Sequence, residues 1–215
     1  MTQVADRQSP ERKRNKEETK NNILVVATEE FADKGFAGAR IDEIAARTQT
    51  TKRMFYYYFS DKEGLYKAVV HRVIRQIRAE EQRVDVDDLA PLDALRRIAE
   101  ITFDYHEAHP EFVRVMADVN TNYAALWPDG KQEELAGPIV GQLERVIERG
   151  VELGDINPAT KAVDLHFIIT SFSFFRISNQ YTFDKLFGRR TIDPRDRERM
   201  RRILGDLVVS HAAAR

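Results

Sequence analysis

The chain has 215 residues, contains no cysteine and carries a formal net charge of -1, with 42% hydrophobic and 32% charged residues. This balance is typical of a water-soluble globular protein, and the lack of thiols excludes a disulfide framework and a thiolate metal site. No apolar run approaches the roughly 20 residues that cross a bilayer, and the polar N-terminus lacks the apolar core of a signal peptide, so we expect a cytoplasmic protein.

The charge is distributed unevenly along the chain. Residues 1–78 carry 16 Lys+Arg and 11 Asp+Glu, whereas the remainder carries 18 and 24. A basic first third on an acidic body is typical of a small nucleic-acid-binding head, although an imbalance of this size also arises by chance.

The first predicted elements are an arm and a helix. Residues 1–18 are charged and nearly free of large apolar groups, so we predict a flexible basic arm that can touch phosphates. Apolar residues then recur at a spacing of four from Ile23 to Phe31, which predicts a helix over residues 19–34 that ends at Gly35.

Two short helices follow, over residues 40–47 and 51–59, joined by a polar turn. The second begins with Thr-Thr-Lys-Arg and ends in four aromatic residues. Basic and hydroxyl groups at a helix start, with tyrosines one turn later, are typical of a helix end that contacts phosphates and base edges. This pattern predicts a helix-turn-helix DNA reader. A capping box over residues 60–63 then predicts the start of a fourth helix.

The rest of the chain also has helical periodicity, with prolines at expected helix starts. Pro91, Pro110 and Pro194 each precede a segment with an apolar stripe. Residues 162–177 are apolar nearly all round, which predicts burial on several sides. No alternating strand pattern occurs. The predicted fold is therefore all-α with about nine helices.

Residues 19–67 resemble the DNA-binding domain of the tetracycline-repressor (TetR) family of transcriptional regulators. The resemblance rests on Ala-Asp-Lys-Gly-Phe at residues 32–36, Ile44-Ala45, and the run Tyr-Tyr-Tyr-Phe at residues 56–59 followed closely by Lys62. It implies a helix-turn-helix domain over residues 19–67 and an effector-binding and dimerisation domain over residues 68–215.

The resemblance also implies DNA-contacting residues. Thr51 would cap the recognition helix and meet a phosphate, Lys52 and Arg53 would reach base edges, and Tyr56 and Lys62 would contact phosphates. The full predicted set is Arg40, Thr50, Thr51, Lys52, Arg53, Tyr56, Tyr58 and Lys62.

Tyr57 and Phe59 are predicted to pack into the core. Tyr58 stands where the family often has His. Gln49 stands in a turn where the family usually has Gly, so it must adopt whatever backbone conformation the turn requires.

For the second domain the resemblance implies a homodimer with an internal pocket for a largely apolar small molecule. The candidate pocket residues are aromatic or polar: Phe103, His106, Phe112, Met116, Tyr123, Trp127, His166, Phe167, Phe174 and Arg176. Arg176 would either bind an anionic ligand or pair with an acidic residue such as Asp164 or Asp118, and pairing is favoured.

The predicted function is a ligand-responsive regulator, most often a repressor in this family, that binds a pseudo-palindromic operator as a dimer and is released by a small molecule. A small helical enzyme and a helical protein-interaction module are the alternatives. The five histidines form no recognised ligand spacing, and no His-Glu-x-x-His, phosphate loop or nucleophile elbow occurs. We therefore predict no enzyme activity, no cofactor and no metal.

Overall fold

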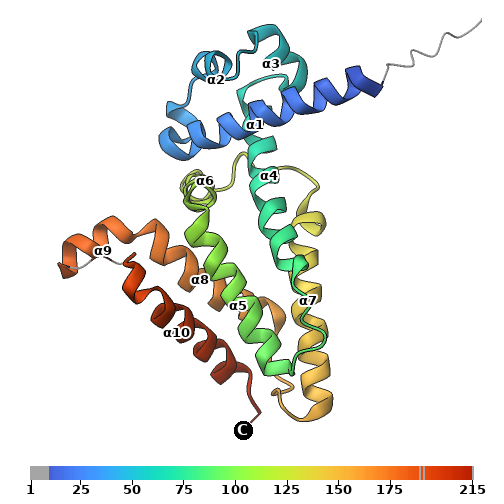
Figure 1. The fold of residues 1–215 in the computed structure, drawn as a ribbon, viewed down its shortest axis with the longest axis vertical. Helices are drawn as coiled ribbons and strands as arrows, with labels where there is room; N and C mark the ends of the chain where they lie inside the picture. Colours follow the sequence, from blue (N-terminus) through green and yellow to red (C-terminus); the bar gives the residue numbers. More distant parts are fainter. Residues whose placement is uncertain (1–9, 189, 191, 215) are drawn as a thin grey trace, which may run out of the picture.

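The computed structural model describes residues 10–188, 190 and 192–214, with side chains from residue 15 onward. In this part of the chain the structure is all-α, apart from an isolated antiparallel bridge between Ile156 and Ala213 (Figure 1). The ten described helices are α1 (Pro10–Gly38), α2 (Ile41–Arg47), α3 (Lys52–Phe59), α4 (Lys62–Arg83), α5 (Pro91–Ala108), α6 (Pro110–Thr121), α7 (Gln132–Leu153), α8 (Ala162–Ser178), α9 (Gln180–Phe187) and α10 (Pro194–Ala212). The predicted fold class is confirmed. No described helix is long and apolar enough to cross a membrane.

Helix α1 begins earlier than predicted. It starts at Pro10, so a flexible arm over residues 1–18 is wrong for residues 10–18, while residues 1–9 lie outside the described residues. The extension is rich in Glu, Lys and Arg, which have high helix propensity and can lengthen a helix that is already nucleated. At its other end α1 is interrupted at Gly35, whose φ is 66°, as expected for a glycine at a helix end.

Two apolar clusters build the molecule. The first, here called the head cluster, lies among α1 to α4 and continues into α6, whose Phe112, Val113 and Val119 are buried in it. The second lies among α5, α7, α8 and α10. Helices α1 to α3 and the start of α4 form the head, and the remaining helices form the body. Figure 1 shows α2 and α3 at one end of the molecule and α10 toward the other, with α4 leading away from the head. The division at residues 67 and 68 falls inside the unbroken α4 and stays a prediction.

The chain turns sharply between α3 and α4, and the turn leaves no room for the predicted capping box. Ser60 ends α3 with a φ of 65°, and Asp61 is the N-cap of α4, where its Oδ1 accepts a hydrogen bond from the Gly64 N–H at 2.7 Å. The predicted box headed by Ser60 is therefore wrong by one residue, because Ser60 is needed to turn the chain. A Cβ on Gly64 would overlap the carbonyl oxygen of Phe59.

Asp118 on α6 connects the body to the head. Its Oδ2 accepts a hydrogen bond from the Tyr66 hydroxyl at 2.6 Å and from the Phe36 N–H at 3.1 Å. Burial, and then the bond to Asp118, raise the pKa of Tyr66, so its phenol remains a donor. Gly35 lies against the same carboxylate, because a Cβ there would be 2.7 Å from Oδ1.

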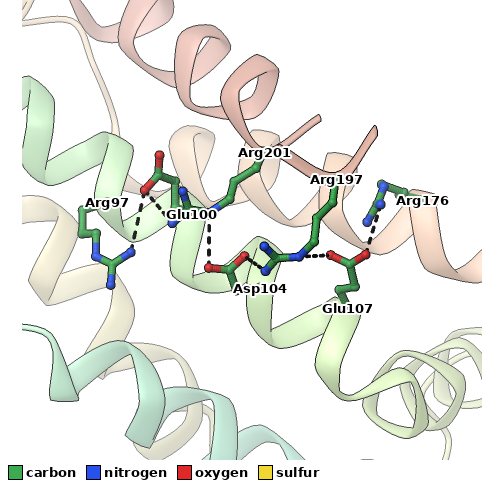
Figure 2. Close-up of polar contacts among 7 residues, drawn as sticks. All are labelled: Arg97, Glu100, Asp104, Glu107, Arg176, Arg197 and Arg201. Atoms are coloured by element: carbon green, nitrogen blue, oxygen red, sulfur yellow. Dashed lines mark hydrogen bonds and ion pairs between the residues drawn. The ribbon is translucent and has the colours of Figure 1, made fainter. Parts of the chain in front are cut away.

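An ion-pair ladder joins α5 to α10 and α8. Acidic residues on α5 alternate with arginines from the other two helices, and Arg97 of α5 itself adds a pair at one end, as Figure 2 shows. The pairs are Arg97–Glu100, Arg201–Glu100, Arg201–Asp104, Arg197–Asp104, Arg197–Glu107 and Arg176–Glu107. The prediction that Arg176 pairs is confirmed. The named partners, Asp164 and Asp118, were wrong, because the ladder on α5 places Glu107 at 3.3 Å.

Candidate functional site

Helices α2 and α3 are held as a rigid pair by their inward faces. Ile44 on α2 and Phe55 and Phe59 on α3 are buried in the head cluster. Between the helices, buried Thr48 donates its hydroxyl to the Ile44 carbonyl at 2.9 Å, which closes the end of α2. The chain then turns at Gln49 with a φ of 52°, in the left-handed region. The expectation that Gln49 adopts the conformation usually given to glycine is confirmed, at a cost of roughly 1–2 kcal/mol.

The start of α3 is capped and faces solvent. The Thr51 hydroxyl accepts a hydrogen bond from the Met54 N–H at 3.3 Å, which confirms Thr51 as the N-cap. Lys52, Arg53 and Tyr56 are all exposed on the outer side of the helix. The arrangement leaves a basic, aromatic surface at a helix N-terminus, where an anion is favoured.

The aromatic run divides differently from the prediction. Tyr57 is 65% exposed, so its expected place in the core is wrong. Tyr58 is the half-buried one: it packs against the head cluster, and its hydroxyl is buried without a hydrogen-bond partner among the described residues. The helical period of 3.6 explains the exchange, since residue 57 lies nearly opposite Phe55 whereas residue 58 lies beside it. Phe59 is buried as predicted.

The two predicted base-reading residues differ in their surroundings. Lys52 forms an ion pair with Asp42 on α2 at 2.6 Å, and both side chains are exposed. This pair raises the pKa of Lys52, mainly because Asp42 accepts a hydrogen bond from the ammonium and also because of its charge. Arg53 is exposed, and no ion pair to it is found among the described side chains. Arg53 is therefore available to a ligand, whereas Lys52 must first leave Asp42.

The remaining predicted contact residues border the same surface. The Lys62 ammonium lies 4.9 Å from the Phe36 ring centroid and 3.3 Å from the Ala37 carbonyl oxygen, which anchors it at the start of α4. Arg40 precedes α2, and its side chain is exposed and caps nothing. Thr50 is half-buried and donates its hydroxyl to the Thr48 carbonyl at 3.1 Å, so it serves the turn.

A cavity of about 290 Å³ lies in the body. It is bordered by α4, α5, α6, α7 and α8 and has largely apolar walls, including Ile74, Leu135 and Ile139. Its polar residues include Arg78 on α4, His106 on α5 and His166 on α8. Burial, and then the charge of Arg78, lower the pKa of His106 to about 3 and that of His166 to about 4, so both rings are neutral near pH 7.

Both the helix-turn-helix head and the helical body with its cavity match known protein families. Residues 23–69 match the bacterial regulatory proteins, tetR family, and residues 91–208 match the tetracyclin repressor-like C-terminal domain. The chain belongs to the tetR family.

Similar proteins agree with this assignment. The HTH-type transcriptional repressor NicS of Pseudomonas putida is 30% identical over 171 residues, covering 79% of this chain and 81% of that protein. The HTH-type transcriptional repressor SCO4008 of Streptomyces coelicolor is 34% identical over 161 residues, covering 74% and 78%. A bacterial regulatory protein in the tetR family from Rhodococcus RHA1 shares the fold, with a TM-score of 0.69 at 21% identity over 92% of this chain and 98% of the other. The chain is therefore a DNA-binding transcriptional regulator, and the enzyme and interaction-module alternatives are not favoured.

The ten candidate pocket residues fall into three groups by their location in the body. His106, Phe112, Met116, Trp127 and His166 line the cavity. Phe174 packs edge-on to His106, and Phe103 is buried beneath the Arg176 guanidinium, 4.7 Å away. Tyr123 and Phe167 are wrong as cavity residues, because they are 95% and 72% exposed, and Arg176 faces Glu107 instead of the cavity.

Sequence reasoning missed the charged pair beside the cavity. Arg78 and Glu81 lie in a stretch of α4 that reads as a solvated helix end, yet Glu81 is buried, with its Oε2 at 2.9 Å from Arg78 Nη1. Their spacing of three on a helix, one turn after buried Ile74, was the available signal.

The Lys52–Asp42 pair leads to a first prediction. Asp42→Asn should tighten binding to DNA of any sequence by a few-fold at low salt, because it releases Lys52 and removes a negative charge that repels the DNA phosphates. Fluorescence anisotropy with random duplexes at several salt concentrations measures this. Asp206→Asn, which breaks a comparable exposed pair with Arg96 on the body, should change nothing. Equal affinities for the wild type and Asp42→Asn would contradict the prediction.

Proposed function

We propose that this regulator is a repressor that binds a pseudo-palindromic operator as a homodimer and releases it when a small molecule fills the body cavity. The observation that carries the proposal is the capped, solvent-facing start of α3, with Arg53 free for base edges and Tyr56 and Lys62 beside it. Two relatives named as repressors, each covered over more than two thirds of its length, support the direction of regulation. Such a repressor would act in the cytoplasm.

An exposed apolar face supports the dimer. Phe167 and Phe175 on α8 and Leu207 on α10 are large apolar residues that face solvent in the single chain, together with Leu186 and Phe187 on α9. Phe167, Phe175 and Leu207 line one groove, and ring contacts run from Phe175 through Phe183 to Phe187. An exposed apolar patch of this kind usually marks a protein interface. A second copy packed across a two-fold axis would bury it and hold two α3 helices for successive major grooves, about 34–36 Å apart.

The cavity supports control by a ligand. Helix α4 begins at Lys62 on the DNA-facing side and carries Arg78 at the cavity wall. A ligand that favours one orientation of α4 would therefore change DNA affinity by the difference in its affinity for the two states.

Selection of bound duplexes from a random pool tests the proposal. The full-length protein should enrich two inverted half-sites whose centres lie one helical turn, about 10 base pairs, or a multiple of it apart. A single unpaired half-site would contradict the dimer, and no enrichment at all would contradict specific binding. Sedimentation of the protein alone reports the oligomeric state independently.

Substitutions on α3 and α4 separate the proposed contact roles. Arg53→Ala should remove about 1–3 kcal/mol of discrimination between the selected site and variants at one base pair, because a base contact is lost. Lys62→Gln should weaken selected and random duplexes alike and lower the salt dependence by about one phosphate contact. Competition titrations measure both. Arg53→Ala weakening all duplexes equally would contradict its base-reading role.

A further inference from the structure

The cavity carries one permanent cation that is only partly compensated. Arg78 cannot lose its proton in a protein, and its only ion-pair partner among the described side chains is Glu81. That carboxylate does not line the cavity. It is 1% exposed, and its Oε1 accepts a hydrogen bond from Thr102 at 3.2 Å. Burial raises the pKa of Glu81 to about 7, so its negative charge is partly lost near neutral pH.

Hydrogen-bond capacity at the cavity is also unused. Nε of Arg78 and Nδ1 of His106 are buried without a hydrogen-bond partner among the described residues. His106 is fixed in place, because its ring stacks on Phe112 at a centroid distance of 5.2 Å. Buried polar atoms left without partners are uncommon in folded proteins, so these two atoms indicate where a ligand would be held.

The remaining walls limit the ligand. A volume of about 290 Å³ lies just below the range for small-molecule sites, roughly 300–1,000 Å³. Apart from its polar residues, which are Arg78, His106, Gln132, His166 and Thr170, the lining is aliphatic and aromatic, with Met116 and Trp127 among it. A cationic ligand would meet Arg78, and a dianion would exceed the single cation present.

We propose that the cavity binds a small monocarboxylate with an apolar body, whose carboxylate contacts Arg78 and His106. The contact with Arg78 is a charge-assisted hydrogen bond in a site of low polarity, and it supplies both affinity and discrimination against uncharged isosteres. The proposal gives the chemical class of the ligand on which the proposed function depends.

Calorimetric titration of the full-length protein without DNA tests this inference. The probes are benzoate, phenylacetate and hexanoate, each paired with its amide. At least one carboxylate should bind saturably and about tenfold or more tightly than its amide, since a hydrogen bond to a charged group is lost in the amide. Carboxylates and amides of equal affinity, or no saturable binding by any carboxylate, would overturn the proposal.

Variants assign the charge to Arg78. Arg78→Met should abolish the preference for the carboxylate, whereas Arg75→Met, one turn away on the same helix and outside the cavity, should leave affinity within about twofold. Because Arg78→Met leaves Glu81 buried without a counter-charge, the double variant Arg78→Met/Glu81→Gln is measured too, with circular dichroism as the check on folding. An unchanged preference in both variants would overturn the role of Arg78.

The experiments distinguish failure of the proposed ligand class from failure of the proposed function. Specific operator binding with no carboxylate binding would refute the ligand class and leave the repressor. Carboxylate binding with no sequence-specific DNA binding would establish the ligand class and refute the operator-binding dimer. Carboxylate binding that leaves operator affinity unchanged would establish the ligand class and refute release by this cavity.

Discussion

Gly64→Ala should abolish DNA binding and destabilise the protein by about 4 kcal/mol or more, in the range that single substitutions reach only through severe overpacking or strain. The added methyl group would overlap the Phe59 carbonyl oxygen, which is backbone and cannot rotate away. The junction between α3 and α4 must open to relieve the overlap, and both α3 and Lys62 then lose their positions. Urea unfolding and anisotropy with the selected duplex measure the two effects.

The control is a helical glycine with free space. At Gly141 on α7 a new Cβ would meet nothing closer than Arg145 Nη1 at 3.8 Å. Gly141→Ala should therefore keep DNA binding and stabilise the protein by about 0.5–1 kcal/mol, because alanine loses less backbone entropy in a helix. If Gly64→Ala matched this control in stability and DNA affinity, the tight junction would not exist in solution.

Asp118→Ala should cost about 2–4 kcal/mol and weaken operator binding. The substitution leaves the Tyr66 hydroxyl and the Phe36 N–H without their acceptor in a partly buried place, and each loses a bond to a charged group. Because these two donors belong to the head and Asp118 belongs to α6, the head should also become freer to reorient. Urea unfolding, with operator affinity measured at fixed salt, reports both consequences.

A matched acidic residue separates this role from loss of charge. Asp129 is almost fully exposed and pairs with Lys67 at 3.2 Å, so Asp129→Ala should have little effect on stability. A double-mutant cycle of Asp118→Ala with Tyr66→Phe should give strong coupling, because both remove the same hydrogen bond. Additive effects would show that Asp118 acts through something other than Tyr66.

The sequence predicted the helices and the head well, because apolar periodicity and capping residues are local signals. Ile23, Ile44 and Phe59 are buried as expected, and the departure at Gln49 proved to be a positive φ. The predicted place of Tyr57 in the core was wrong, because the helical period, and not the family position, decides which tyrosine faces the head cluster.

The body was predicted less well, because its side-chain partners come from helices far apart in the chain. Nothing near Arg176 in the sequence indicates that Glu107 faces it, and Tyr123 looks like a pocket aromatic until the bend after α6 turns it outward. The Arg78–Glu81 pair was missed for a related reason: a charged helix segment is usually solvated, and only packing by α5 and α7 buries this one.

The unbroken course of α4 sets the scale of movement that a ligand must cause. Sixteen residues separate Arg78 from Lys62, which is about 24 Å along a helix at 1.5 Å per residue. A tilt of roughly 10° about the cavity end would then displace Lys62 by about 4 Å, more than the length of a hydrogen bond to phosphate. Under the proposed mechanism, a small rearrangement around Arg78 would therefore be sufficient to move the start of α4 out of reach of the DNA backbone.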